Sequence, residues 1–231
     1  MKIAEHFNGR FNAFDNADAL ASALSSRIAT DLGKSEKPTL AVSGGRTPTL
    51  FFQKLSNIEL NWSQTSVTLI DERWVPESHK DSNGALVKAN LLQSNAAAAR
   101  FVPMFREGEQ SEALAEIRAD VAAFPAALDA GVLGMGNDGH TASLFPEAST
   151  LPEAMDLNQT ERCLFVQPPE APHLRLTLSR AYIQSANALY LHIQGEDKLA
   201  TLERALSDND VMAMPIRAFL DLPQLEIFWC P

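Results

Sequence analysis

Apolar and polar positions follow two different periods along the chain. Over residues 20–32 an apolar residue recurs at every fourth position, which predicts a helix. Asp15 or Asn16 can cap its beginning and Gly33 can end it. The apolar run Thr39–Val42 that follows is too short for a helix and ends in glycines, so it predicts a buried strand.

The same two patterns continue to the end of the chain. Further strands are predicted at Ser66–Glu72, Arg100–Met104, Val132–Met135, Cys163–Val166, Arg175–Leu178, Ala188–Ile193 and Glu226–Trp229. Helices are predicted at Pro48–Leu55, Ser82–Leu92, Ser111–Phe124, after Ser179 and at Glu196–Leu206. Strands that alternate with helices need crossover connections, which predicts an α/β fold with a mainly parallel sheet flanked by helices. No Ser/Gly-rich linker or repeat divides the sequence, so we expect a single domain over residues 1–231.

Composition narrows the class of protein. The 231 residues are 45% hydrophobic and 21% charged, as in ordinary globular proteins. The formal net charge of -10 argues against binding to nucleic acid or to anionic lipid, since both need a basic face. Cys163 and Cys230 are isolated and predict buried free thiols in a reducing compartment. The sequence has no signal-peptide pattern and no run of about 18 apolar residues, so we expect a cytoplasmic protein without a membrane span.

The loop after the first predicted strand has the character of an anion site. Its glycines let the backbone approach a ligand, the following helix start offers free N–H groups, and the arginine adds a planar cation. The residues concerned are Ser43, Gly44, Gly45, Arg46 and Thr47. A tight turn with a Thr47 helix cap remains an alternative, and the sequence is not a Walker loop. Ser43 also imitates a nucleophile elbow, but too little sheet precedes it for an α/β-hydrolase.

Two more strand ends carry reactive side chains. Asp71, Glu72 and Arg73 leave the second predicted strand together, either as a solvated charge cluster or as a site in which Arg73 steadies an oxyanion. Ligands of such sheets bind beyond the carboxyl ends of the strands, so we expect the three loops Ser43–Thr47, Asp71–Pro76 and Gly136–His140 to meet there.

The third loop carries the strongest candidate for proton transfer. Three glycines in Gly134–Thr141 free a loop that presents Asp138 and His140, and imidazole suits proton transfer at neutral pH. The loop also matches G-x-G-x-x-G, but Phe145-Pro146 interrupts the helix that a dinucleotide site needs. The remaining histidines have no metal-ligand spacing along the chain, so we expect no metal site and take them as structural or exposed: His6, His79, His173 and His192.

Taken together, these segments resemble the 6-phosphogluconolactonases of the pentose phosphate pathway. The matching motifs are SGGRTP (43–48), DERWVP (71–76), DSN (81–83), GMGNDGHTASLFP (134–146), RLTLS (175–179) and GEDK (195–198). The resemblance implies a Rossmann-like α/β sandwich shared with glucosamine-6-phosphate deaminases. It implies hydrolysis of a sugar-phosphate lactone with no cofactor, no metal and no obligate protein partner.

The resemblance also implies roles for individual residues. His140 would be the base, Asp138 would orient it, and Arg73 would stabilise the oxyanion. The substrate would be bound by the first loop together with residues known here only from the resemblance: Asp71, Asn83, Arg175 and Lys198. Arg46 departs from the small hydroxyl residue of many members and should add to phosphate binding.

Two other functions are compatible with parts of the sequence. Related deaminases share the Asp-Gly-His loop, but they carry a glutamate where this chain has Phe145 and usually a tyrosine where it has Arg73. Non-catalytic sugar-phosphate sensors share the core but add a DNA-binding module, for which this acidic chain shows no spare segment.

Overall fold

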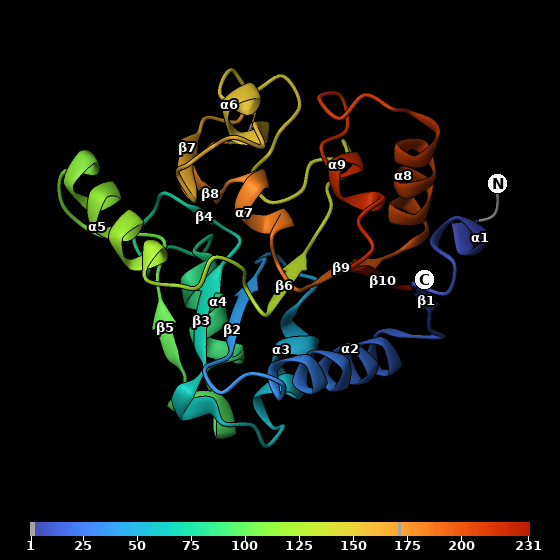
Figure 1. The fold of residues 1–231 in the computed structure, drawn as a ribbon, viewed down its shortest axis with the longest axis horizontal. Helices are drawn as coiled ribbons and strands as arrows, with labels where there is room; N and C mark the ends of the chain where they lie inside the picture. Colours follow the sequence, from blue (N-terminus) through green and yellow to red (C-terminus); the bar gives the residue numbers. More distant parts are fainter. Residues whose placement is uncertain (1–2, 171) are drawn as a thin grey trace.

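A large parallel sheet forms the centre of the molecule. The computed structural model describes residues 3–170 and 172–231. Within these residues, seven parallel strands have the order β1-β10-β9-β6-β2-β3-β5 (Figure 1). They span β1 Phe11–Ala13, β2 Thr39–Val42, β3 Ser66–Leu69, β5 Arg100–Val102, β6 Ala130–Leu133, β9 Ala188–Gln194 and β10 Leu225–Cys230. The predicted mainly parallel α/β fold is therefore confirmed.

A second, antiparallel sheet was not predicted. It has the order β4-β8-β7 and consists of β4 Asp71–Arg73, β7 Cys163–Val166 and β8 Arg175–Leu178. The single strand predicted at Ser66–Glu72 is wrong, because the chain passes from one sheet to the other at Ile70. The Ile70 N–H donates to the Val42 carbonyl of the large sheet, and the Ile70 carbonyl accepts the N–H of Leu178 in the small one.

The longer helices follow the predicted segments closely, whereas the short helices α1, α6 and α9 were not predicted. Their bounds are α1 Ile3–Phe7, α2 Ala17–Leu32, α3 Thr49–Ser56, α4 Asn83–Asn90, α5 Gln110–Ala122, α6 Leu151–Met155, α7 Arg180–Gln184, α8 Glu196–Ser207 and α9 Arg217–Leu220, with short 3-10 turns at Trp62–Gln64 and Ser94–Ala98. Asn16 caps α2, since its side chain accepts the N–H of Ala19 at 2.9 Å, and Gly33 ends that helix as expected. Figure 1 shows α2 and α3 side by side along the large sheet, where they pack together.

Among the strand boundaries that differ from the prediction, two have a local explanation. Strand β5 stops at Val102 because Pro103 has no N–H for the ladder. Strand β6 begins at Ala130 rather than at Val132, since Gly131 pairs inside the sheet instead of forming a turn.

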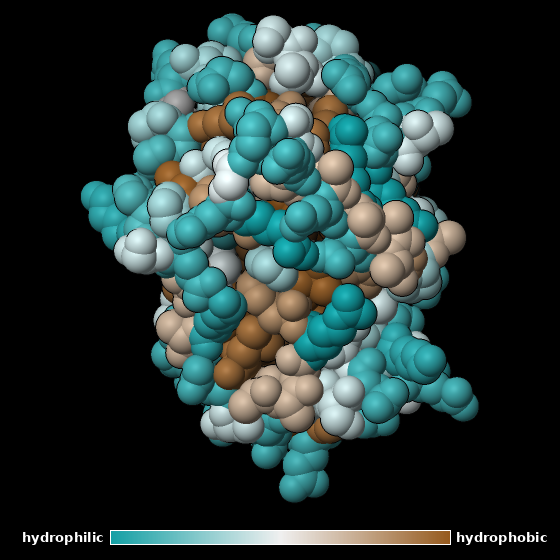
Figure 2. Space-filling model, turned by 90° about the vertical axis from the view of Figure 1, so that its left-hand side faces the viewer, coloured by the Kyte–Doolittle hydropathy of each residue, from teal (hydrophilic) through white to brown (hydrophobic). Residues whose placement is uncertain are grey.

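One continuous apolar core joins the two sheets to the helices around them. Both cysteines are buried free thiols, as the sequence predicted. Burial raises the pKa of Cys163 to about 11. Figure 2 shows the side of the molecule that carries β5 and α5, where polar side chains surround apolar ones gathered near the middle. No helix in residues 3–170 and 172–231 has both the length and the apolar character that crossing a membrane requires.

Candidate active site

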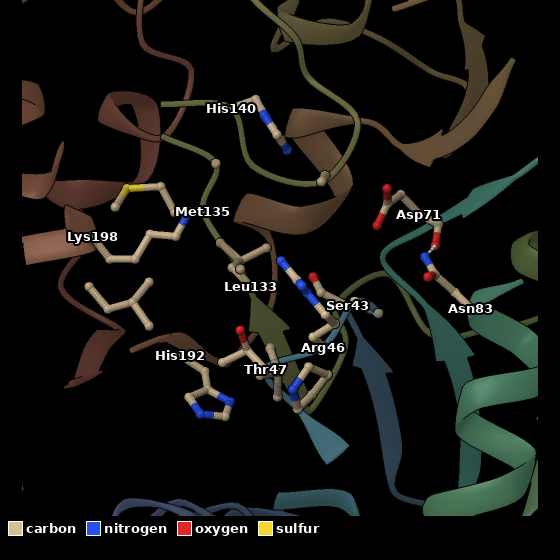
Figure 3. A pocket seen from close by; sticks show the side chains of 18 of the residues that line it. Ser43, Arg46, Thr47, Asp71, Asn83, Leu133, Met135, His140, His192 and Lys198 are labelled. Carbon is tan, nitrogen blue, oxygen red and sulfur yellow. Dashed lines mark hydrogen bonds between the residues drawn. The ribbon is translucent and has the colours of Figure 1, made fainter. Parts of the chain in front are cut away.

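A cleft of about 520 Å³ opens at the carboxyl ends of the central strands. It lies where the strand order reverses between β2 and β6, the place at which open α/β sheets bind ligands. In Figure 1 the small sheet and helices α8 and α9 lie above this edge. The cleft brings together all three predicted loops and most of the predicted site residues: Ser43, Gly44, Gly45, Arg46, Thr47, Asp71, Arg73, Asn83, His140, Arg175 and Lys198 (Figure 3). Asp138 does not line the cleft itself, but it is hydrogen-bonded to His140, which does.

The loop after β2 is shaped by its two glycines. Gly45 has φ +94°, a backbone conformation that side chains rarely allow. A Cβ on Gly44 would overlap the side chain of Asn83, so that glycine lets Asn83 lie across the loop. The Asn83 amide donates to the Asp71 carbonyl at 2.8 Å, while its oxygen and the Ser43 hydroxyl, both buried, have no partner among the described residues.

The expected Thr47 helix cap is absent from the described structure. Helix α3 begins at Thr49, and Pro48 holds the cap position without a side-chain hydrogen bond. Proline suits this entry because its φ is already fixed near the helical value. Thr47 instead lines the cleft with the rest of the loop.

His140 and Asp138 form a hydrogen-bonded pair at the mouth of the cleft. The His140 Nδ1 lies 2.6 Å from the Asp138 Oδ1, which also accepts the backbone N–H of His140 at 3.1 Å. Because the carboxylate accepts from Nδ1–H, the lone pair of the ring lies on Nε2. Burial raises the pKa of Asp138, but the hydrogen bonds and charge of His140 outweigh it and lower that pKa overall. Asp138 is thus ionised at neutral pH and holds His140 in the tautomer of a general base.

The loop that carries this pair is closed on itself. The Gly136 N–H donates to the His140 carbonyl at 2.8 Å, and the Thr141 hydroxyl donates to the Gly134 carbonyl at 2.7 Å. Helix α6 does not begin until Leu151, so the dinucleotide alternative lacks its helix. Two side chains of α8 support the loop from outside, since Lys198 and Arg204 donate to Asn137 at 2.5 and 2.7 Å.

Replacing Gly136 with alanine should lower kcat by about 10²-fold, because the new Cβ would overlap His140 and Asp138 and displace the pair by about an ångström. Gly134→Ala is the matched control, because a Cβ there meets no atom within 4 Å and should leave kcat near native. Steady-state kinetics of the two variants check this expectation. Equal kcat values for both would mean that the position of the pair does not limit the rate.

A buried glutamate ties the β4 strand to α4. The Glu72 carboxylate accepts the backbone N–H groups of Arg73, Asn83 and Gly84 at 2.7–2.8 Å. Burial raises the pKa of Glu72, and these three hydrogen bonds partly oppose the rise. Glu72 is therefore a positioning residue that fixes Asn83 at the start of α4, a role that the charge cluster in the sequence did not reveal.

Two arginines face each other across β4 and β8. Arg73 is in register with Arg175, and its guanidinium donates to the Asp81 carbonyl at 2.7 Å. Arg175 is only 8% exposed, and its side chain has no acceptor or ion pair among the described residues. Burial, and then the charge of Arg73, lower the pKa of Arg175. A buried guanidinium without an anion is costly, so this pair of cations is suited to an anionic ligand.

The aromatic ring of Phe145 links Arg175 to the proposed base. The Arg175 guanidinium lies 5.8 Å from the Phe145 ring centre, and the His140 ring centre lies 4.3 Å from it. Figure 3 shows Arg46 projecting into the same cleft between Ser43 and His140. Arg46 is exposed and makes no ion pair within the described part of the chain.

His192 is a cleft residue that the sequence did not single out. It lies in β9, is 4% exposed, and sits edge-on to Phe51, with Gln194 at 3.3 Å from its Nε2. Burial lowers the pKa of His192 to about 4. The sequence predicted a structural or exposed histidine here, and nothing in the apolar run of β9 shows that the ring lines the cleft.

His192 should make folding stability depend on pH. At pH values between about 4 and 6.5, His192 is protonated in the unfolded chain but neutral in the folded protein. The contribution is therefore complete above pH 6.5 and is lost as pH falls, at about 1.4 kcal/mol per pH unit. Urea titrations at pH 7 and pH 5 should show that native protein loses ~2 kcal/mol more than His192→Asn. Parallel losses in both proteins would exclude a buried neutral His192.

Comparison with known proteins agrees with the fold and with the family resemblance of the sequence motifs. The family model described as Glucosamine-6-phosphate isomerases/6-phosphogluconolactonase matches residues 12–229. The 6-phosphogluconolactonase of Pseudomonas aeruginosa is 47% identical over 222 residues, which cover 95% of this chain and 92% of that protein. That of Rhizobium meliloti is 42% identical and covers 97% of this chain and 100% of its own length.

Solved structures give the same result. A crystal structure of a 6-phosphogluconolactonase from Shewanella baltica has a TM-score of 0.91 at 40% identity and covers 96% of this chain and 97% of that one. A monomeric glucosamine-6-phosphate deaminase has a TM-score of 0.79 at 14% identity over 95% of this chain and 96% of its own, which shows a shared fold alone. The chain belongs to the glucosamine-6-phosphate isomerase/6-phosphogluconolactonase family.

Proposed function

We propose that this protein hydrolyses 6-phospho-D-glucono-1,5-lactone to 6-phosphogluconate in the oxidative pentose phosphate pathway. The observation that carries the proposal is the His140–Asp138 pair in one cleft with two cations, Arg46 and Arg175, that make no ion pair within residues 3–170 and 172–231. The relatives from Pseudomonas aeruginosa and Rhizobium meliloti, both named 6-phosphogluconolactonase, support it.

His140 acts as the general base in this proposal. Its Nε2 takes a proton from a water molecule as the water oxygen bonds to the lactone carbonyl carbon. Asp138 holds the ring in position and stabilises the imidazolium that forms. When the bond between the carbonyl carbon and the ring oxygen breaks, His140 returns the proton to that oxygen. A lactone is an activated ester, so the step needs no covalent nucleophile, metal or cofactor.

The cations of the cleft divide between the two charged parts of the substrate. Arg73, fixed by the Asp81 carbonyl, stabilises the oxyanion of the tetrahedral intermediate. The loop after β2, with Arg46, Arg175 and Lys198, binds the phosphate. Asp71 and Asn83 bind sugar hydroxyls on the opposite wall, where Figure 3 shows them hydrogen-bonded to each other.

A coupled assay tests the proposed function. Purified protein should convert the phosphorylated lactone to 6-phosphogluconate, which a dehydrogenase then reports, and should release no ammonia from glucosamine 6-phosphate. Ammonia release without lactone hydrolysis would instead favour the deaminase activity of the wider family. We further propose that the substrate is the only partner that the activity needs. Because its buried free thiols suit a reducing compartment, we also propose a cytoplasmic location, which cell fractionation tests.

A further inference from the structure

Two histidines and an aspartate meet beside Arg73, outside the set of residues that line the cleft. His79 and Asp81 lie in the segment between β4 and α4, and His173 comes just before β8. The Asp81 Oδ2 lies 3.2 Å from the His173 Nε2 and 3.8 Å from the His79 Nδ1. One ligand atom from each residue lies within 4.8 Å of the other two. About 90 residues separate His173 from the other two along the chain, so sequence spacing could not show this cluster.

The spacing of these atoms suits a first-row transition metal. Ligand atoms bound at ~2.0–2.2 Å to a tetrahedral zinc ion lie ~3.4 Å apart, between the two distances to Asp81. Two imidazoles and a carboxylate are ligands that zinc, nickel and cobalt accept. The two rings meet edge to face with centres 5.2 Å apart, so small rotations bring both nitrogens towards one ion.

The side chains of the cluster supply the donor atoms that a metal ion needs. The His79 Nδ1 accepts the backbone N–H of Asp81 at 3.2 Å, so that nitrogen carries a lone pair which a metal can take over. The Asp81 carboxylate adds an oxygen ligand, and the His173 Nε2 that lies 3.2 Å from it gives up its proton when it binds the metal. Lys80 and Arg73 also repel a cation, which predicts an affinity below that of closed structural zinc sites.

We propose that His79, Asp81 and His173 bind one divalent transition-metal ion, with zinc as the representative, and leave the remaining coordination positions to water. The ion joins the segment before α4 to the segment before β8. These segments lead directly into Asn83, the first residue of α4, and Arg175, the first residue of β8, and the Asp81 carbonyl accepts a hydrogen bond from Arg73. The site is separate from the His140–Asp138 pair and does not depend on the proposed hydrolysis.

Metal titration of tag-free, chelator-treated protein tests the site. Zinc added in competition with a chromophoric chelator should bind at one equivalent per protein. Bound cobalt should give a visible absorption band typical of an ion with a low coordination number. His79→Ala and His173→Ala should each weaken zinc binding at least ~10–100-fold, the cost of losing even an outer-shell partner. His6→Ala is the matched control, because His6 pairs with a single carboxylate, Asp221, and should not change the affinity.

Several outcomes would overturn the proposal. The native protein could fail to bind zinc, or the His79→Ala/His173→Ala double variant could bind zinc with native affinity. Loss of zinc binding in His140→Ala instead would place the metal at the other histidine. The three ligands are partly exposed, so their substitution should not prevent folding. His79→Gln and His173→Gln, which keep a polar side chain, provide a second pair of variants, and thermal unfolding confirms that each is folded.

Discussion

Replacing His140 with alanine should lower kcat for the phosphorylated lactone by ~10²–10⁴-fold, the usual range for a lost general base. KM should change little, because the cations and the loop after β2 remain in place. Initial rates from the coupled assay measure the effect, after subtraction of spontaneous lactone hydrolysis. The background matters because it sets the lowest rate that the variant can show.

A histidine far from the cleft provides the control for this variant. His6 lies in α1, and its imidazole also pairs with a carboxylate, that of Asp221. The His6→Ala variant should therefore keep native kcat. A folded His140→Ala protein with near-native kcat would show that His140 is not the base. Asp71, a buried carboxylate that lines the cleft, would then be the next candidate.

The native protein should prefer the phosphorylated lactone over plain gluconolactone by ~10³-fold or more in kcat/KM. Charge-assisted hydrogen bonds contribute ~1.5–3 kcal/mol each. The net charge of -10 repels an anionic substrate, so this preference must come from local donors: the loop after β2, Arg46, Arg175 and Lys198. Three such bonds, reduced by desolvation, still leave several kcal/mol, and ~1.4 kcal/mol corresponds to a factor of ten.

Arg46→Ala separates the phosphate contribution from the rest of the site. Because Arg46 is exposed, its loss should reduce kcat/KM for the phosphorylated lactone by about tenfold, at the low end of the range for charged hydrogen bonds. The rate on plain gluconolactone should scarcely change. Arg100→Ala, at an exposed arginine of the distant β5 strand, controls for the lost charge. Comparable native rates on the two lactones would contradict the phosphate site.

The sequence predicted the meeting of three loops because the rule behind it is general. Parallel strands end at one edge, so the loops predicted at Ser43–Thr47, Asp71–Pro76 and Gly136–His140 were expected to lie together, although Asp71–Arg73 forms the strand β4. The contributions of Asn83, Arg175 and Lys198 came only from family resemblance. Their positions depend on α4, the small sheet and α8, and no local pattern shows how those elements pack.

Other features were hidden because they depend on contacts that are distant in sequence. The run Ser66–Glu72 reads as one strand, and the change of sheet at Ile70 is visible only once β2 and β8 provide its hydrogen-bond partners. His192 lies in an apolar strand like any core residue. His79 and His173 become neighbours only because β4 pairs with β8.

The position of Ile70 between the two sheets couples their local unfolding. One residue contributes its N–H to the large sheet and its carbonyl to the small one. The two walls of the cleft therefore share a single cooperative unit, and local unfolding of one wall must loosen the other. Slow amide exchange should extend without a break from the end of β3 across Ile70 to Leu178. A bound substrate that spans the walls would protect both sheets together rather than one at a time.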